Sequence, residues 1–254
     1  MSLRHQAQVA ASVLASTLTG WRGTRALTDV KPAAQPLILF DIEACPHCRA
    51  VRQALTALRL DVLIQPCPKG GQRFRGQAQA LSAKTQFPLL VDPNTGKTLQ
   101  ESAAIVDYLF ATYGQGAAPQ RLRPSRWMAS LGSLASASRG LRGLSARPAK
   151  VAAQPLHLWS FESSPYSRLV RERLCELELP YVLHNLGKEQ FADMGPARLR
   201  VRPGPYKPLP DGPRAAMLRR VGRVQVPYLE DPNTGSKLFE SEDILAYLER
   251  QYAL

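Results

Sequence analysis

The chain has 254 residues, enough for one large domain or for two domains of about 100 to 120 residues each. Four cysteines are too few for the disulfide framework of a secreted protein, and no run of about 18 apolar residues predicts a membrane span. The net charge is +13, but the basic residues cluster in connecting segments without an aromatic stacking platform or a groove-reading motif. We therefore expect no specific nucleic-acid binding, and a weak contact with a membrane surface or an acidic partner through these segments stays open.

Residues 1–34 form an N-terminal segment with two interpretations. Arg4, Arg22 and Arg25 accompany several serines and threonines, and no acid precedes Asp29, which is the composition of a transit peptide. Large apolar residues also recur there at helical spacing: Val9, Val13, Leu14, Leu18 and Trp21. That spacing equally predicts an amphipathic helix that docks on the protein or on a membrane surface. We expect a cytoplasmic protein, with a plastid location as the alternative.

The next segment places two thiols between a predicted strand and a predicted helix. An apolar run over 37–41 predicts a buried strand, and Cys45-Pro46-His47-Cys48 opens a helix-like stretch over 46–59. Unpaired N–H groups and the dipole at a helix start favour a thiolate, so we expect a lowered pKa for Cys45. Cys48 follows one turn later, where it can attack a mixed disulfide formed by Cys45, and a charged His47 would tune the couple. The pattern predicts a redox-active dithiol, and no metal site is expected because zinc would need a second cysteine pair.

The chain is an internal duplication. Residues 35–55 and 154–174 share ten of 21 aligned positions, and residues 86–109 and 225–248 share fourteen of 24. The second copy is about 20 residues longer between these blocks, and its extra Pro- and Arg-rich stretch predicts a surface loop over 195–213.

Both copies have sequence patterns that predict the same order of elements. In the first copy these are a strand (37–41), a helix (46–59), a strand (62–65), a helix (73–83), a hairpin (88–91 with 97–100) and a helix capped by Ser102. We therefore expect an α/β protein with two domains, 35–114 and 154–254, each a mixed four-stranded sheet with helices on both faces. Apolar residues at helical spacing also predict a short helix in the linker 115–153: Trp127, Met128, Leu131 and Leu134.

The spacing of Cys45-Pro46-x-Cys48, Phe87-Pro88 and Glu101-Ser102 resembles glutaredoxins and the N-terminal, glutathione-binding domain of glutathione S-transferases. The chain from about residue 35 to the end resembles proteins built of two such thioredoxin-fold domains in tandem. The resemblance implies a cis proline at Pro88, with the backbone of Phe87 pairing with the cysteinyl unit of glutathione. It also implies that Glu101 takes the ammonium, and Ser102 the carboxylate, of the γ-glutamyl end.

The second copy keeps parts of this pattern but loses the thiols. The positions that match a glutathione site there are Ser164, Val226, Pro227, Glu240 and Ser241. Serine cannot exchange disulfides, so Ser164 either hydrogen-bonds a bound glutathione or is only a helix N-cap. Of the remaining cysteines, Cys175 is predicted to face the core, and Cys67, just beyond a strand and near a lysine, is interpreted as structural.

We expect a glutathione-linked thiol–disulfide oxidoreductase that acts on client protein disulfides through Cys45 and Cys48, with glutathione as co-substrate. The alternative is a non-enzymatic module that binds glutathione or a protein, or that bridges an iron–sulfur cluster in a dimer through Cys45. Glutathione transfer to electrophiles ranks third, because the 254 residues leave no room after the second copy for the all-helical domain of a transferase.

Overall fold

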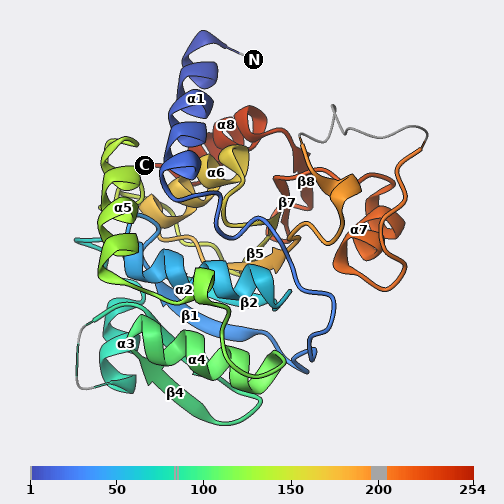
Figure 1. Ribbon diagram of the computed structural model, residues 1–254. Coiled ribbons are helices and arrows are strands. Elements are labelled where there is room, and N and C mark those ends of the chain that lie inside the picture. The colour runs from blue at the N-terminus through green and yellow to red at the C-terminus, as the bar shows by residue number, and fades with distance from the viewer. Residues whose placement is uncertain (1, 83, 85, 196–204) are drawn as a thin grey trace.

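The computed structural model describes residues 2–82, 84, 86–195 and 205–254 (Figure 1). The first copy contains β1 (Leu37–Asp41), α2 (Pro46–Ala57), β2 (Val62–Pro66), α3 (Arg75–Leu81), β3 (Leu89–Asp92), β4 (Lys97–Gln100) and α4 (Ser102–Tyr113). The second copy repeats this order as β5 (Leu156–Ser160), α6 (Pro165–Glu176), β6 (Tyr181–Asn185), α7 (Pro213–Val221), β7 (Tyr228–Asp231), β8 (Ser236–Phe239) and α8 (Ser241–Tyr252). A further helix precedes each copy, α1 (Leu3–Leu18) and α5 (Arg126–Ala137), and two short 3₁₀ turns cover Gln120–Leu122 and Phe191–Asp193.

The strands form one mixed sheet in the order β4-β3-β1-β2-β6-β5-β7-β8, so the predicted fold class is confirmed. Each copy contributes four strands, with a parallel pair at the centre and an antiparallel hairpin at the outside. Strands β2 and β6 join the two halves by antiparallel pairing, with Val62 opposite Leu183 and Ile64 opposite Tyr181. This junction was not predicted. It satisfies backbone groups that two separate four-stranded sheets would leave exposed on an edge strand.

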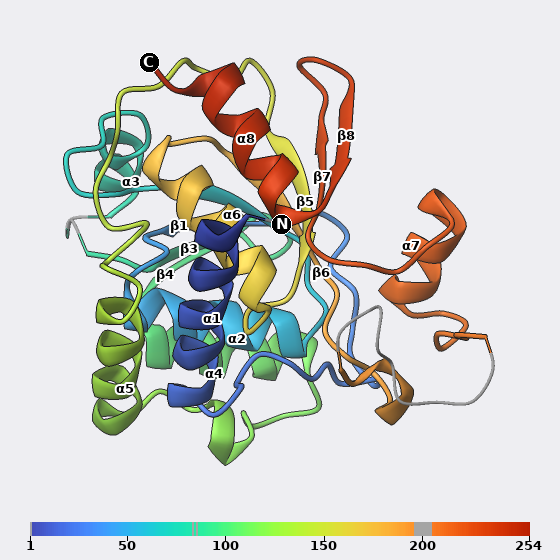
Figure 2. The same cartoon turned by 90° about the horizontal axis from the view of Figure 1, so that it is seen from above.

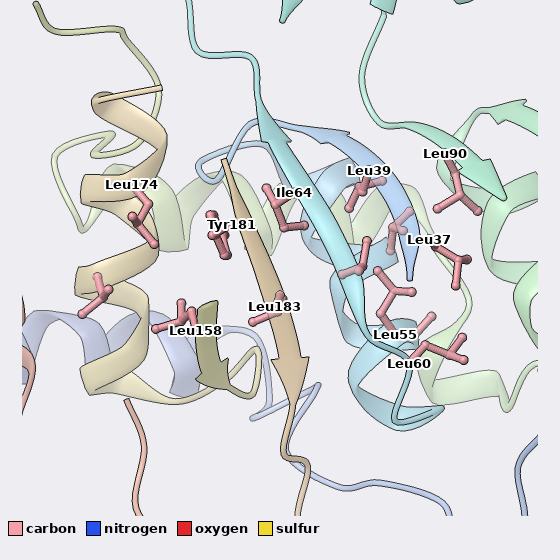
Figure 3. Packing of buried hydrophobic residues seen from close by; sticks show 14 of the residues in the cluster. Leu37, Leu39, Leu55, Leu60, Ile64, Leu90, Leu158, Leu174, Tyr181 and Leu183 are labelled. Carbon is pink, nitrogen blue, oxygen red and sulfur yellow. The ribbon is translucent and has the colours of Figure 1, made fainter. Parts of the chain in front are cut away.

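Helices cover both faces of the sheet because successive strand residues point to opposite sides. In β1, Leu37 and Leu39 belong to the large core with α2 and α4, whereas Phe40 packs in a smaller cluster with Ala78 of α3. The second copy shows the same division: residues of β5 contact either α6 and α8 or α7. Figure 3 shows the large core running from Leu90 through Ile64 and Leu183 to Leu174. A single apolar layer therefore spans both copies.

The two extra helices are exchanged between the copies (Figure 2). Helix α1 precedes the first copy but packs on α6 of the second, and α5 precedes the second copy but packs on α2 of the first. The two helices also pack against each other. Matching contacts anchor them: Ser16 Oγ donates to the Ser163 carbonyl at 2.8 Å, and Ser136 Oγ donates to the Ala44 carbonyl at 2.7 Å. The N-terminal amphipathic segment thus lies on the protein.

A buried ion network fixes the two copies side by side. Arg52 bonds Glu162 of the other copy at 2.9 Å, and Arg171 bonds Glu43 in return at 3.1 Å. Arg52 also pairs with Asp41 at 2.6 Å, and all five side chains are at most 3% exposed. Buried charges are tolerated only when they are paired in good geometry, so this network specifies how the halves meet.

Three local expectations can be compared with the described residues. The linker helix is confirmed as α5, while the helix expected over 73–83 is shorter and ends at Leu81. The loop expected over 195–213 lies in part outside the described residues, at 196–204. None of the helices in the described part of the chain combines the length and the apolar character needed to cross a membrane.

Candidate functional site

The strand register gathers the first-copy site at one edge of the sheet. Phe40 of β1 pairs with Leu89, and Leu89 pairs with Gln100 of β4. Pro88, just before β3, therefore lies between the end of β1 and Glu101, just after β4. The dithiol loop also leaves the sheet at the end of β1, so the three sequence elements converge.

Cys45 occupies the N-cap of α2, and Pro46 is its first helical residue, as expected for a proline without an N–H. The Cys45 side chain is half-buried, Cys48 is fully buried, and both are free thiols. His47 points to solvent between them. One thiol is therefore accessible, and the second lies behind it.

The two thiols have opposite acidities. A hydrogen bond from Cys48 lowers the pKa of Cys45 to about 6, against the opposing effect of burial. Backbone N–H groups of Cys48 and His47 add to the lowering, and the His47 charge contributes least. Burial first, then the bond and charge of Cys45, raise the pKa of Cys48 well above its usual value. Cys45 is therefore both the more acidic and the more accessible of the two thiols.

Helix α5 packs directly on the start of α2. Arg49 Nη1 donates to the Gly132 carbonyl at 2.9 Å, and its Nη2 donates to Ser136 Oγ at 3.0 Å. A Cβ on Gly132 would lie 2.8 Å from the Pro46 side chain, so only glycine permits this approach. These supporting residues were not predicted from the sequence. The signal that could have found them is a longer repeat, because Ala15-Ser16 and Gly20-x-x-Gly23 recur as Ala135-Ser136 and Gly140-x-x-Gly143.

The Phe87–Pro88 peptide bond is cis, as the resemblance implied. The Arg75 guanidinium lies 5.2 Å from the centre of the half-buried Phe87 ring. Glu101 is exposed and has a φ of 70°, a conformation that is uncommon for non-glycine residues. Contrary to the sequence prediction, Glu101 is the N-cap of α4, and Ser102 is its first helical residue and is buried.

The second copy keeps the backbone of this site with different chemistry. The Val226–Pro227 bond is also cis, and Glu240 repeats the positive φ at 64°. Ser164 is the N-cap of α6, and its hydroxyl accepts hydrogen bonds from Ser167 N at 3.3 Å and Ser167 Oγ at 2.9 Å. Ser241 bonds His5 of α1 at 3.0 Å.

The remaining cysteines are buried. Burial raises the pKa of Cys67 to about 12 and that of Cys175 well above its usual value. Cys175 Sγ donates to the Gly143 carbonyl at 3.2 Å. Neither thiol is available at neutral pH. Within the described ranges, no group of three or more His, Cys, Asp or Glu side chains is arranged to hold a metal ion.

Comparison with known families agrees with this geometry. The family described as "Glutathione S-transferase, N-terminal domain" matches twice, over residues 39–118 and 158–254. These matches cover more than half of the chain, so the protein belongs to that family, whose thioredoxin-fold domains bind glutathione in general. No curated protein and no solved structure matches the chain. The predicted tandem arrangement is confirmed.

Proposed function

We propose that the protein is a glutathione-linked thiol–disulfide oxidoreductase that acts through Cys45 and Cys48. The observation that carries the proposal is the half-buried Cys45 thiol at the start of α2, which receives a hydrogen bond from Cys48 and has a pKa of about 6. With that pKa, most of Cys45 is thiolate at neutral pH, the form that attacks disulfides. Cys45 and Phe87 pack against the same small apolar cluster, and the strand register brings the Phe87–Pro88 bond to the end of β1, so the family's glutathione position lies at the same edge of the sheet as Cys45.

The cycle begins when the Cys45 thiolate attacks the glutathione sulfur of a glutathionylated protein thiol. The old S–S bond breaks, the client leaves as a thiolate that takes up a proton, and Cys45 carries glutathione in a mixed disulfide. A second glutathione thiolate then attacks the glutathione sulfur of that mixed disulfide. Oxidised glutathione leaves, and the Cys45 thiolate returns. Two glutathione-derived electrons have reduced one disulfide.

Cys48 has a defined part in a second route. While Cys45 is a thiolate, its charge and hydrogen bond hold the Cys48 proton in place. Formation of a mixed disulfide removes that negative charge, so the Cys48 proton becomes easier to lose. The Cys48 thiolate then attacks Cys45, expels the bound thiolate and forms the Cys45–Cys48 disulfide. Two molecules of glutathione reduce this disulfide and leave as oxidised glutathione.

The neighbouring residues fit glutathione as the co-substrate. The backbone before Pro88 offers an edge to which an extended peptide can pair. Glu101 is exposed and can bind the ammonium of the γ-glutamyl group, while the N–H groups at the start of α4, near Ser102, can bind its carboxylate. These roles follow the family pattern at matching positions.

The test is glutathione-dependent reduction of a small mixed disulfide by the wild type, Cys45→Ser, Cys48→Ser and the control Cys175→Ser. We expect loss of activity with Cys45→Ser and unchanged activity with Cys175→Ser, whose hydroxyl can replace the thiol as a donor to Gly143. Retained activity in Cys48→Ser supports the route through free glutathione, and loss supports the dithiol route. An inactive wild type with reduced thiols would overturn the proposal and favour a non-enzymatic binding module.

A further inference from the structure

The second copy contains a cavity of about 1070 Å³ at the position that corresponds to the dithiol site of the first. Ser164, the Val226–Pro227 bond, Glu240 and Ser241 line it. Most of its remaining wall comes from segments that precede the copies: the end of α1 with residues 19–25, Gln120–Leu122 and one side of α5. The cavity is at the upper end of the size range for small-molecule sites.

In the second copy, the polar groups that the family pattern would assign to glutathione already form hydrogen bonds with other residues of the protein. The Ser164 hydroxyl accepts two bonds from Ser167, and Glu240 accepts a bond from Gln225 Nε2 at 2.8 Å. Ser241 bonds the buried His5 of α1, which has no counterpart at Ser102 among the described contacts of the first copy. Glutathione would have to displace these partners. The second copy therefore does not offer glutathione the same open recognition groups.

Apolar side chains also line the cavity. Leu18 ends α1 and Trp21 follows it, α5 contributes Met128 and Leu131, and the loop after β5 contributes Phe161. Trp21 and Phe161 are large, rigid surfaces that gain free energy when they are removed from water, roughly 25 cal/mol for each Å² of apolar area buried. An apolar ligand body fits against these side chains.

Basic side chains also line the cavity, namely Arg22, Arg25, Arg121, Lys188 and Arg214, and two of them, Arg22 and Arg121, lie close together. Burial, followed by the charge of Arg121, lowers the pKa of Arg22, so the two cations are close enough to repel each other. Neither forms an ion pair with an acid among the residues that the structure describes.

The acidic side chains that line the cavity interact with residues other than Arg22 and Arg121. Asp193 accepts bonds from the Tyr206 hydroxyl and the Glu189 N–H and lies 3.7 Å from Arg214, and Glu240 is held by Gln225. Two neighbouring cations that form no ion pair with an acid in the described part of the chain, and that line a largely apolar cavity, attract an anionic group.

We propose that this cavity binds an amphiphilic anion: a molecule with an apolar body against Trp21, Phe161 and Leu131 and a single carboxylate or similar oxyanion between Arg22 and Arg121. The site is independent of thiol chemistry, because the second copy has serine in place of both cysteines. In this proposal the two copies have different functions: the first carries out redox chemistry and the second binds a ligand. This proposal does not depend on the proposed redox function, and the two are tested separately.

The experiment uses the full chain and a fluorescent polyunsaturated fatty acid as the probe, displaced by dodecanoate or by dodecanol. The two competitors share their apolar chain, so their difference reports the anionic contact. We expect dodecanoate to displace the probe at a concentration at least about tenfold lower than dodecanol, as expected when a charge-assisted bond is gained. Equal potency of the two competitors, or displacement of the probe by glutathione at low millimolar concentration, would overturn the proposal.

Matched variants locate the site. Arg22→Ala with Arg121→Ala should weaken probe binding about tenfold or more and abolish the preference for dodecanoate. The control pair is Arg142→Ala with Arg126→Ala: Arg142 occupies the position of Arg22 in the repeat, and neither residue lines the cavity. Leu131→Trp should block both competitors by filling the chamber. Thermal unfolding verifies that each variant is folded, and equal effects of the two arginine pairs would contradict the assignment.

Discussion

Replacing Cys48 by alanine removes the hydrogen-bond donor that does most to lower the pKa of Cys45. Serine at the same position keeps an O–H donor of similar reach, so Cys48→Ser is the matched control. We predict that the pKa of Cys45 rises from about 6 toward that of an ordinary thiol in Cys48→Ala and stays close to the wild-type value in Cys48→Ser. The comparison separates the hydrogen bond from the helix start, which both variants retain.

The pKa of Cys45 is a more sensitive measure of the lost hydrogen bond than the reaction rate of Cys45 at a single pH. At pH 7, a pKa of about 6 leaves roughly nine-tenths of the thiol ionised, whereas an ordinary cysteine with a pKa of about 8.5 is roughly 3% ionised. The thiolate fraction thus falls about thirtyfold if the pKa returns fully. The more basic thiolate is intrinsically more nucleophilic, by about tenfold for this change of pKa. The rate at pH 7 therefore falls only about threefold.

The assay is alkylation by iodoacetamide across a pH series, with the Cys45 peptide quantified by mass spectrometry. The rate rises with pH and reaches a plateau above the pKa. Cys67 and Cys175 serve as internal controls, because burial keeps both protonated at neutral pH. Midpoints that coincide in the wild type and Cys48→Ala would refute the hydrogen-bond account of the Cys45 thiolate.

Three further predictions concern the structure around the site. Gly132→Ala should lower the unfolding temperature, since its Cβ would come within 2.8 Å of the proline that begins α2; Gly76→Ala in α3, where nothing lies within 4 Å, should be neutral or stabilising. Arg52→Met should cost about 3 to 5 kcal/mol of unfolding free energy in urea titrations, because buried Asp41 loses the guanidinium that pairs with it and Glu162 keeps only its other arginine partners, and Arg147→Met, in an exposed pair, less than about 1. The pKa of Glu162 is lowered to about 2, so its contribution of about 3 kcal/mol is present above about pH 4.5 and is lost as the pH falls toward 2. Glu162→Gln should reduce the loss of unfolding free energy between about pH 4.5 and 2. Parallel plots of unfolding free energy against pH for the variant and the wild type would disprove the assignment of this loss to Glu162.

The sequence was sufficient for elements whose signals are local. Two turns of identical sequence, Asp92–Gly96 and Asp231–Gly235, place the hairpins, and the Phe87–Pro88 and Cys45–Cys48 motifs place the site. Apolar spacing also located α5. These signals are strong because turn residues and helical periodicity depend on neighbours in the chain.

The arrangement of the copies could not be predicted, because it depends on contacts between residues far apart in the sequence. Strands β2 and β6 have apolar runs that suit any buried strand. These runs do not specify which strand each one pairs with. The crossed pairs of Arg52 with Glu162 and Arg171 with Glu43 involve charged residues, a type that is mostly exposed and that gives no local sign of a buried partner. The misplaced cap at Ser102 has a local cause: its preceding Glu101 adopts a positive φ that residue type does not predict.

Trapping the mixed disulfide that the cycle requires tests the proposed oxidoreductase function most directly. Cys48→Ser is incubated with oxidised glutathione, and the adduct is located by mass spectrometry of the unreduced peptides. We predict one glutathione per chain, on Cys45, with Cys67 and Cys175 unmodified and with release by added reduced glutathione. An adduct on a different cysteine, or an unmodified Cys45 under conditions in which the folded protein is confirmed, would contradict it.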